Sequence, residues 1–248
     1  METVGAYAFS FDDWQELEYP LDLWIKYNSK FFDELSLVFI GDRNKLPEIN
    51  ENNIKVTYIR EAKEKNWDIY RLYKQIAQSQ LSTDWKLLLD IDEFVNNKID
   101  VTTLRKDRIY AIKMRHLYLN THTEVLNAFP DYYWRFHYGV IPVIRDGSID
   151  GKKMQRISPH LVKKFWYQLL HNGIRRMIYK PEIVAEVWHT NALRSPNAIM
   201  NKRKIQIERE NAEKGSCVRV DNNFYEYLNS QFEIREAIPP MDLVKYYG

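Results

Sequence analysis

The sequence predicts an α/β protein of one domain, with a mixed, mainly parallel sheet that is covered by helices. Strand and helix signals alternate over the first 95 residues, as is typical of parallel strands joined by helices. Beyond residue 95 the β-prone runs are less regular, which indicates that the later part of the sheet is mixed. The chain has 248 residues and is 45% hydrophobic, enough to bury one substantial core.

The first half contains signals for four strands and two helices. Pro20 stands where the first turn of a helix tolerates proline, ahead of apolar residues at helical spacing. A second helix is expected where an apolar stripe with a helical period precedes Trp85. The expected strands are residues 3–9, 35–40, 54–59 and a run that starts at Trp85, and the expected helices follow Pro20 and span 67–81.

The second half contains three longer strand signals and one clear helix signal. Ser195 is a plausible N-cap residue, and Pro196 would occupy the first helical position. The expected strands are residues 108–120, 132–145 and 183–190, and the expected helix spans 195–211. The aromatic run at 131–138 fits either stacking against a sugar or packing in a core.

The cysteine content and the distribution of apolar residues exclude several classes of protein. The single cysteine, Cys217, excludes an intramolecular disulfide framework and a cysteine-based zinc cluster. The N-terminus does not resemble a signal peptide, and no apolar run approaches the roughly 20 residues that span a membrane. We therefore expect a soluble, cytoplasmic protein.

Charge is unevenly distributed, although the net charge is only +2. Residues 151–215 contain 14 Lys or Arg against five Glu and no Asp. This excess indicates either ordinary solvated faces or a surface for phosphates. Peripheral contact at the inner membrane face is compatible with it, whereas nucleic acid is not an expected partner because no RNA-binding motif accompanies the basic residues.

The strand that starts at Trp85 ends in three carboxylates, Asp90, Asp92 and Glu93. The carboxyl ends of such strands are where open α/β sheets bind ligands. Closely spaced carboxylates repel each other, and a divalent cation removes the repulsion. Mg²⁺ or Mn²⁺ would bind one or two of these oxygens and leave other positions for substrate phosphates. The alternative is a solvated acidic turn or a salt bridge to a nearby lysine.

Several kinds of protein fit these features. Dehalogenase-type phosphatases also carry an Asp-x-Asp motif, but at the end of their first strand and with Thr or Val two positions after it. Here three strands precede the motif and Phe94 occupies that position. A metal-dependent phosphatase or nucleotidyltransferase remains an alternative. So does a non-catalytic module that binds nucleic acid or a membrane through the basic C-terminal half.

Residues 84–94 read Asp-Trp-Lys-Leu-Leu-Leu-Asp-Ile-Asp-Glu-Phe. This phrase resembles family 2-like and family 92-like glycosyltransferases of the GT-A fold, in which an Asp-x-Asp motif holds a sugar nucleotide through a metal. The order of elements is similar over about residues 3–204, but only this phrase and His189 match closely. The resemblance implies one GT-A-like, Rossmann-like domain over 1–248. Its parts would be a nucleotide-sugar-binding half (1–95), an acceptor-side half (96–215) and a C-terminal extension (216–248).

The resemblance implies transfer of a hexose-type sugar from a UDP- or GDP-linked donor to the hydroxyl of an acceptor that the sequence does not identify. Metal ligation is expected from Asp90, Asp92 and His189, with Mn²⁺ or Mg²⁺ as the ion. The remaining substrate contacts are assigned to Asp42, Arg60, Asp90, Glu93, Arg194 and Lys202. The last two would meet the diphosphate near a helix N-terminus.

An inverting enzyme also needs a carboxylate base near the acceptor. The Glu-Asp pair that supplies it in family 2 members has no counterpart in this chain. Asp146 and Asp150 are the nearest candidates, although Asp146-Gly147 is also an ordinary turn pair. Whether the enzyme inverts or retains therefore stays open.

Overall fold

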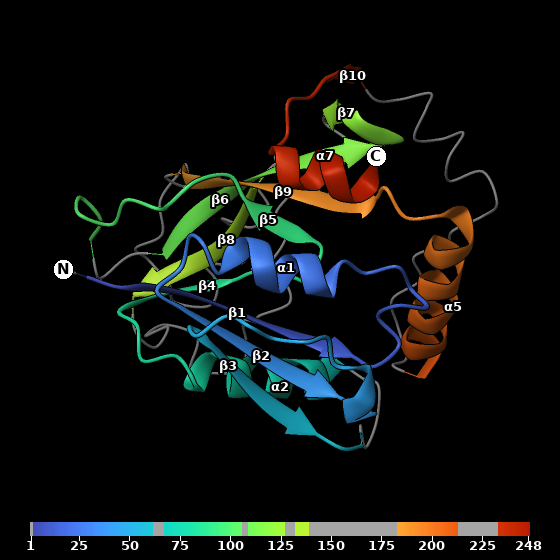
Figure 1. The fold of residues 1–248 in the computed structure, drawn as a ribbon, viewed down its shortest axis with the longest axis horizontal. Helices are drawn as coiled ribbons and strands as arrows, with labels where there is room; N and C mark the ends of the chain where they lie inside the picture. Colours follow the sequence, from blue (N-terminus) through green and yellow to red (C-terminus); the bar gives the residue numbers. More distant parts are fainter. Residues whose placement is uncertain (1, 62–66, 106–108, 127–131, 139–182, 213–232) are drawn as a thin grey trace, which may run out of the picture.

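The fold was analysed in a computed structural model, which describes residues 2–61, 67–105, 109–126, 132–138, 183–212 and 233–248. Its first half contains four parallel strands in the order β3-β2-β1-β4 (Figure 1). Their bounds are Val4–Phe11 for β1, Glu34–Ile40 for β2, Ile54–Ile59 for β3 and Trp85–Leu88 for β4. All four predicted strands are confirmed, and they form the predicted parallel part of the sheet.

The sheet continues beyond β4 as a mixed part, as predicted. β8 is antiparallel to β4, β6 is antiparallel to β8, and β9 is parallel to β6. β9 therefore runs in the same direction as β1 and β4. β5, β7 and β10 were not predicted as separate strands. The bounds are Glu93–Val95 for β5, Ile109–Tyr118 for β6, Asn120–Leu126 for β7, Tyr132–Tyr138 for β8, Ile183–Ala192 for β9 and Glu233–Glu236 for β10.

Helices cover both faces of the parallel strands. Side chains of β1 alternate between two cores: Ala6 packs in the cluster that contains Trp24 of α1, and Tyr7 packs with Tyr73 of α2. The helices are α1 (Leu21–Asn28), α2 (Trp67–Ser79), α5 (Pro196–Ala212) and α7 (Met241–Tyr247), with a 3₁₀ turn η1 at Arg43–Lys45. None of the helices in the described ranges combines the length and apolar character needed to cross a membrane.

The strand order reverses between β1 and β4. From β1 the chain moves outward to β2 and β3, and then returns through α2 to β4 on the other side of β1. The carboxyl ends of β1 and β4 thus flank the point where the strand order reverses, which is where doubly wound α/β proteins bind ligands. β9 is parallel to these strands, so its carboxyl end lies at the same end of the sheet.

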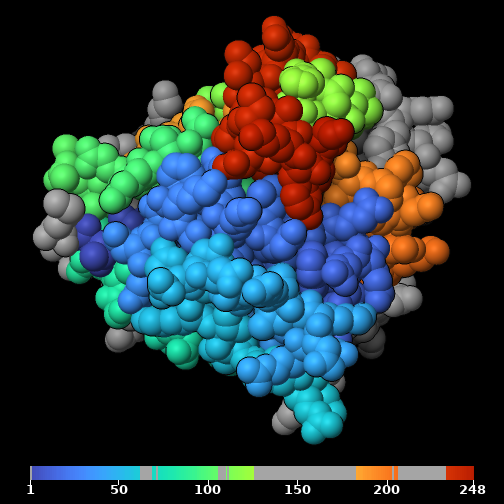
Figure 2. Space-filling model, in the orientation of Figure 1, coloured from blue at the N-terminus to red at the C-terminus, as the bar shows by residue number. Residues whose placement is uncertain are grey.

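Helices α1 and α7 pack beside this end of the sheet. The fully buried Asn28, at the end of α1, donates to the carbonyl of Glu93 and accepts from the amide of Val95, both at 3.2 Å. The C-terminal helix α7 packs on the same side as α1 (Figure 2), with Leu243 in the core and Lys30 paired to Asp242 at 2.8 Å. These contacts hold β5 and α7 in place beside the carboxyl ends of β1 and β4.

Candidate metal centre and adjoining pocket

Asp90 and Asp92 lie in a turn between β4 and β5, and Glu93 is the first residue of β5. β4 ends at Leu88, and the turn is closed because the amide of Glu93 donates to the carbonyl of Asp90 at 2.9 Å. The Glu93 carboxylate in turn accepts from the amide of Asp90 at 2.9 Å. Asp90 lies 3.9 Å from Lys74 Nζ of α2, so it makes the lysine salt bridge that was the alternative to metal ligation.

Asp92, Glu93 and His189 together form a group with the donor atoms for a metal ion. Their ligand atoms lie within 4.8 Å of one another, and the group does not include Asp90. β5 and β9 bring the group together, because Glu93 pairs with His189 across these strands. Asp92 is only 4% exposed, and its carbonyl accepts from the amide of Thr190 at 2.9 Å. Two carboxylates and an imidazole are a suitable set of ligands for Mn²⁺.

Basic side chains surround Asp92. His189 Nε2 lies 3.6 Å and Lys202 Nζ 4.0 Å from Asp92 Oδ2. Burial alone would raise the pKa of Asp92, but a protonated His189, Lys202 and Arg194 outweigh burial and hold this pKa well below its usual value. Asp92 is therefore ionised at neutral pH, as a metal ligand must be.

His116 is a residue of this site that the sequence did not indicate. Its Nδ1 lies 2.9 Å from Nδ1 of His189 on the neighbouring strand, and the two residues are register partners of β6 and β9. A hydrogen bond between two Nδ1 atoms requires one ring to donate and the other to accept. When a neutral His189 donates through Nδ1, its Nε2 keeps a lone pair for a metal ion, and the ring then no longer contributes a positive charge beside Asp92. His116 can thus select the tautomer of His189 that binds a metal.

We expect His116→Gln to lower the affinity for Mn²⁺ by roughly 10- to 100-fold, the range typical for loss of a partner that orients a ligand. His122→Gln is the matched control, because His122 is exposed on β7. Titration of each variant with Mn²⁺ in a calorimeter measures the change. Equal affinities in the two variants would contradict a role for His116.

The other predicted substrate residues are distributed along the same edge. Arg194, 5% exposed, donates to the carbonyl of Leu17 at 3.1 Å and lies 4.2 Å from the ring centre of Tyr19. Asp42 follows β2 and accepts from the amide of Asn44 at 2.9 Å, so it caps η1. Arg60 is exposed after β3, and at ordinary strand spacing β3 lies roughly 14 Å from β4. The candidate bases Asp146 and Asp150 lie outside the described residues.

The helix N-terminus proposed for phosphate is already occupied by a side chain. Ser195 does cap α5, because its hydroxyl accepts from the amide of Ala198 at 3.3 Å. However, the Glu18 carboxylate accepts from both the amide and the hydroxyl of Ser195, each at 2.6 Å. Among the predicted phosphate contacts, Lys202 is therefore the side chain best placed beside the metal group.

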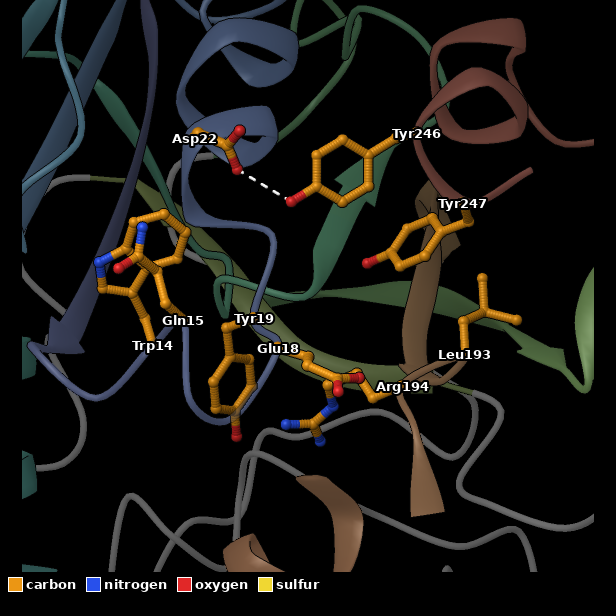
Figure 3. Close-up of a pocket in the computed structure, with 9 residues that line it drawn as sticks. All are labelled: Trp14, Gln15, Glu18, Tyr19, Asp22, Leu193, Arg194, Tyr246 and Tyr247. Atoms are coloured by element: carbon orange, nitrogen blue, oxygen red, sulfur yellow. Dashed lines mark hydrogen bonds between the residues drawn. The ribbon is translucent and has the colours of Figure 1, made fainter. Parts of the chain in front are cut away.

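The side chains labelled in Figure 3 line a pocket of about 440 Å³. Its walls come from the turn after β1, the start of α1, the loop after β9 and the end of α7. Tyr19 connects the pocket to the metal group, since Lys202 Nζ lies 5.1 Å from the centre of its ring. The sequence did not indicate this pocket, because its walls are far apart along the chain.

No protein-family model matches this chain, and no curated protein matches it either.

Proposed function

We propose that this protein is a metal-dependent glycosyltransferase, which transfers a sugar from a nucleoside-diphosphate sugar to an acceptor hydroxyl. The observation that carries the proposal is the position of Asp92, Glu93 and His189. They form an acidic, imidazole-containing group after β4, at the point where the strand order reverses, with cationic side chains next to them. A divalent cation and a diphosphate are complementary to this combination of charges. The GT-A-like phrase at 84–94 supports the same assignment.

Asp92, Glu93 and His189 would hold Mn²⁺ or Mg²⁺, and the mixture of oxygen and nitrogen atoms favours Mn²⁺. When bound, such an ion supplies positive charge that stabilises the leaving diphosphate. Lys202 adds a cation beside the group, and its amino group is held by Asn191 Oδ1 at 2.8 Å. Arg194 contributes a buried positive charge, while its guanidinium stays bound to backbone carbonyls.

Replacing Lys202 is expected to have opposite effects on the affinity for free Mn²⁺ and on the affinity for the Mn²⁺–nucleotide complex. Its ammonium competes with a metal ion for Asp92 but attracts a diphosphate. We therefore expect Lys202→Met to bind free Mn²⁺ at least as tightly as the wild type, yet to bind the Mn²⁺–nucleotide complex roughly ten- to a hundredfold more weakly. Calorimetric titrations with Mn²⁺ alone and with Mn²⁺ plus UDP or GDP test both signs. Parallel losses in both titrations would contradict the assignment of Lys202 to the phosphates.

Thermal unfolding in the presence of Mn²⁺ and a panel of UDP- and GDP-sugars tests the proposed function. We expect stabilisation that requires both the metal and a nucleotide sugar, because ligands that bind only the folded state raise its melting temperature. Asp100→Asn, at an exposed position after β5, is the matched control for Asp92→Asn. Indifference to every nucleotide sugar, or equal responses of the two variants, would contradict the proposal. Turnover of a phosphoester without an acceptor would favour a phosphatase.

A further inference from the structure

We propose that the pocket between α1 and α7 binds an uncharged pyranose ring of a sugar substrate. The inference rests on the proposed function, because it assigns a substrate class to the space next to the same metal centre. The volume of about 440 Å³ falls within the range of small-molecule pockets. The chemistry of the lining, its charge and its contacts with residues beside Asp92 each limit the kind of ring that the pocket can bind.

The lining is rich in aromatic side chains whose polar atoms are already bonded. Trp14 donates its indole N–H to the carbonyl of Lys45 at 2.8 Å, and the Tyr246 hydroxyl bonds to Asp22 at 3.0 Å. Tyr247 donates to Thr190 Oγ1 at 2.9 Å. Figure 3 shows these rings and Tyr19 around one space. Flat ring faces suit the C–H face of a pyranose, and carboxylates at the rim suit its hydroxyls.

The charge of the pocket disfavours an anionic ring. Among the residues that line the pocket, Glu18 and Asp22 contribute two carboxylates and Arg194 one guanidinium, while Lys202 is not part of the lining and lies 5.1 Å from the centre of the Tyr19 ring. The hydrogen bonds from Ser195 hold the pKa of Glu18 below its usual value, so Glu18 stays ionised at neutral pH. Glu18 also has a backbone φ of +52°, an uncommon conformation for a residue other than glycine, and both carboxylate oxygens are tied to Ser195. A carboxylate or phosphate on the ring would meet this negative charge, whereas a neutral hexose would not.

Two sets of contacts link the pocket to the metal centre. Tyr247 of the lining bonds to Thr190, and the amide of Thr190 donates to the carbonyl of Asp92 at 2.9 Å. The Tyr19 ring of the lining also lies near Arg194, at 4.2 Å, and near Lys202, at 5.1 Å. A ring in the pocket would therefore lie beside the group that binds the diphosphate, where a transferred or accepting sugar has to be.

Saturation-transfer NMR with glucose, galactose and N-acetylglucosamine as probes tests the pocket without metal or nucleotide. We expect at least one of these neutral sugars to bind more tightly than glucuronic acid. Tyr246→Ala should weaken that binding about tenfold, because the 43% exposed ring supplies a stacking face. Lys245→Ala, the exposed neighbour on α7, is the matched control and should leave binding unchanged. Asp22→Asn should bind glucuronic acid more tightly than the wild type does.

The inference is overturned if glucuronic acid binds as tightly as the neutral sugars, or if Tyr246→Ala and Lys245→Ala behave alike. Because nucleotide and metal are absent, its failure is distinct from a failure of the nucleotide-sugar experiment. Adding Mn²⁺ and UDP or GDP then separates the two sources of the ring. If the ring belongs to the donor, Tyr246→Ala removes the extra affinity of the nucleotide sugar over the nucleotide. If it belongs to the acceptor, the variant loses only the binding of free hexose to the nucleotide complex.

Discussion

Replacing Asp92 by Asn is expected to abolish binding of Mn²⁺ and of nucleotide sugars while the protein stays folded. Asp92 is a buried carboxylate whose side chain lies 3.6 Å from His189 and 4.0 Å from Lys202. Loss of its charge removes a metal ligand, so the affinity should fall by more than the roughly 10- to 100-fold typical of an outer partner. Calorimetric titration with Mn²⁺ measures this loss.

The same substitution should destabilise the metal-free protein only modestly. Asn keeps an oxygen near His189 but removes the negative charge that Lys202 and Arg194 face, while Glu18 remains beside Arg194, so the cost is about 1–3 kcal/mol. That is less than the stability of most domains. Denaturant unfolding of wild type and variant without metal separates the two effects. Full retention of metal binding in Asp92→Asn would contradict the assignment of the site.

Replacing Glu124 by Gln is expected to produce the largest loss of stability. Glu124 is 1% exposed on β7, and its carboxylate accepts from Arg115 Nε at 2.9 Å and Arg115 Nη2 at 2.7 Å. A third donor comes from Arg235 of β10. Gln cannot replace the charge-assisted hydrogen bonds to the two arginines, but both arginines remain partly exposed and Arg115 keeps Glu186 at 3.8 Å, so the cost is about 2–3 kcal/mol. The melting temperature should fall by roughly 5–10 °C for a chain of this size.

Glu186→Gln is the matched control for Glu124→Gln. Glu186 pairs with Lys113 at 2.7 Å and with Arg115 at 3.8 Å, but its side chain is 32% exposed, so its loss should cost less than about 1 kcal/mol. Equal losses of stability in the two variants would contradict the expectation that burial determines how much each ion pair contributes to the free energy of unfolding.

Glu124 also gives the stability a defined pH dependence. Burial alone would raise the pKa of Glu124, but its hydrogen bonds and ion pairs with Arg115 and Arg235 hold the pKa below the usual value of a glutamate. Because folding lowers this pKa, the contribution of Glu124 to the free energy of unfolding is complete above about pH 4.5 and decreases as the pH falls below that value. Acid unfolding should accordingly be less steep in Glu124→Gln than in the wild type. An unchanged slope would contradict the ion-pair account.

Local patterns were sufficient to predict much of the fold. Apolar runs with β-branched and aromatic residues locate β1, β2 and β3, and the helical stripe before Trp85 locates α2. β5 was missed as a separate strand because it has only three residues and follows the Asp90–Asp92 turn directly. β10 and α7 are also short, with four and seven residues, and long-range packing of residues such as Leu243 stabilises them.

The site was predictable in part, for the same physical reason. Asp92 stands directly after a strongly apolar strand, and His189 lies within a β-prone run, so local sequence indicated both. The His116–His189 contact joins residues 73 positions apart, and its only local signal is that both histidines lie on strands that become neighbours. Asp90 pairs with Lys74, whereas Asp92 belongs to the metal group. Which aspartate joins that group depends on where β4 ends, and the sequence does not specify this end to one residue.

The central claim is that Asp92, Glu93 and His189 hold a divalent cation to which the diphosphate of a nucleotide sugar binds. Pulsed electron paramagnetic resonance of Mn²⁺, recorded with the protein and a stabilising nucleotide sugar, tests it most directly. We predict magnetic coupling of Mn²⁺ both to an imidazole nitrogen and to phosphorus, with the nitrogen coupling lost in His189→Gln. Phosphorus coupling without any nitrogen coupling, or a spectrum identical to that of free Mn²⁺, would contradict the account.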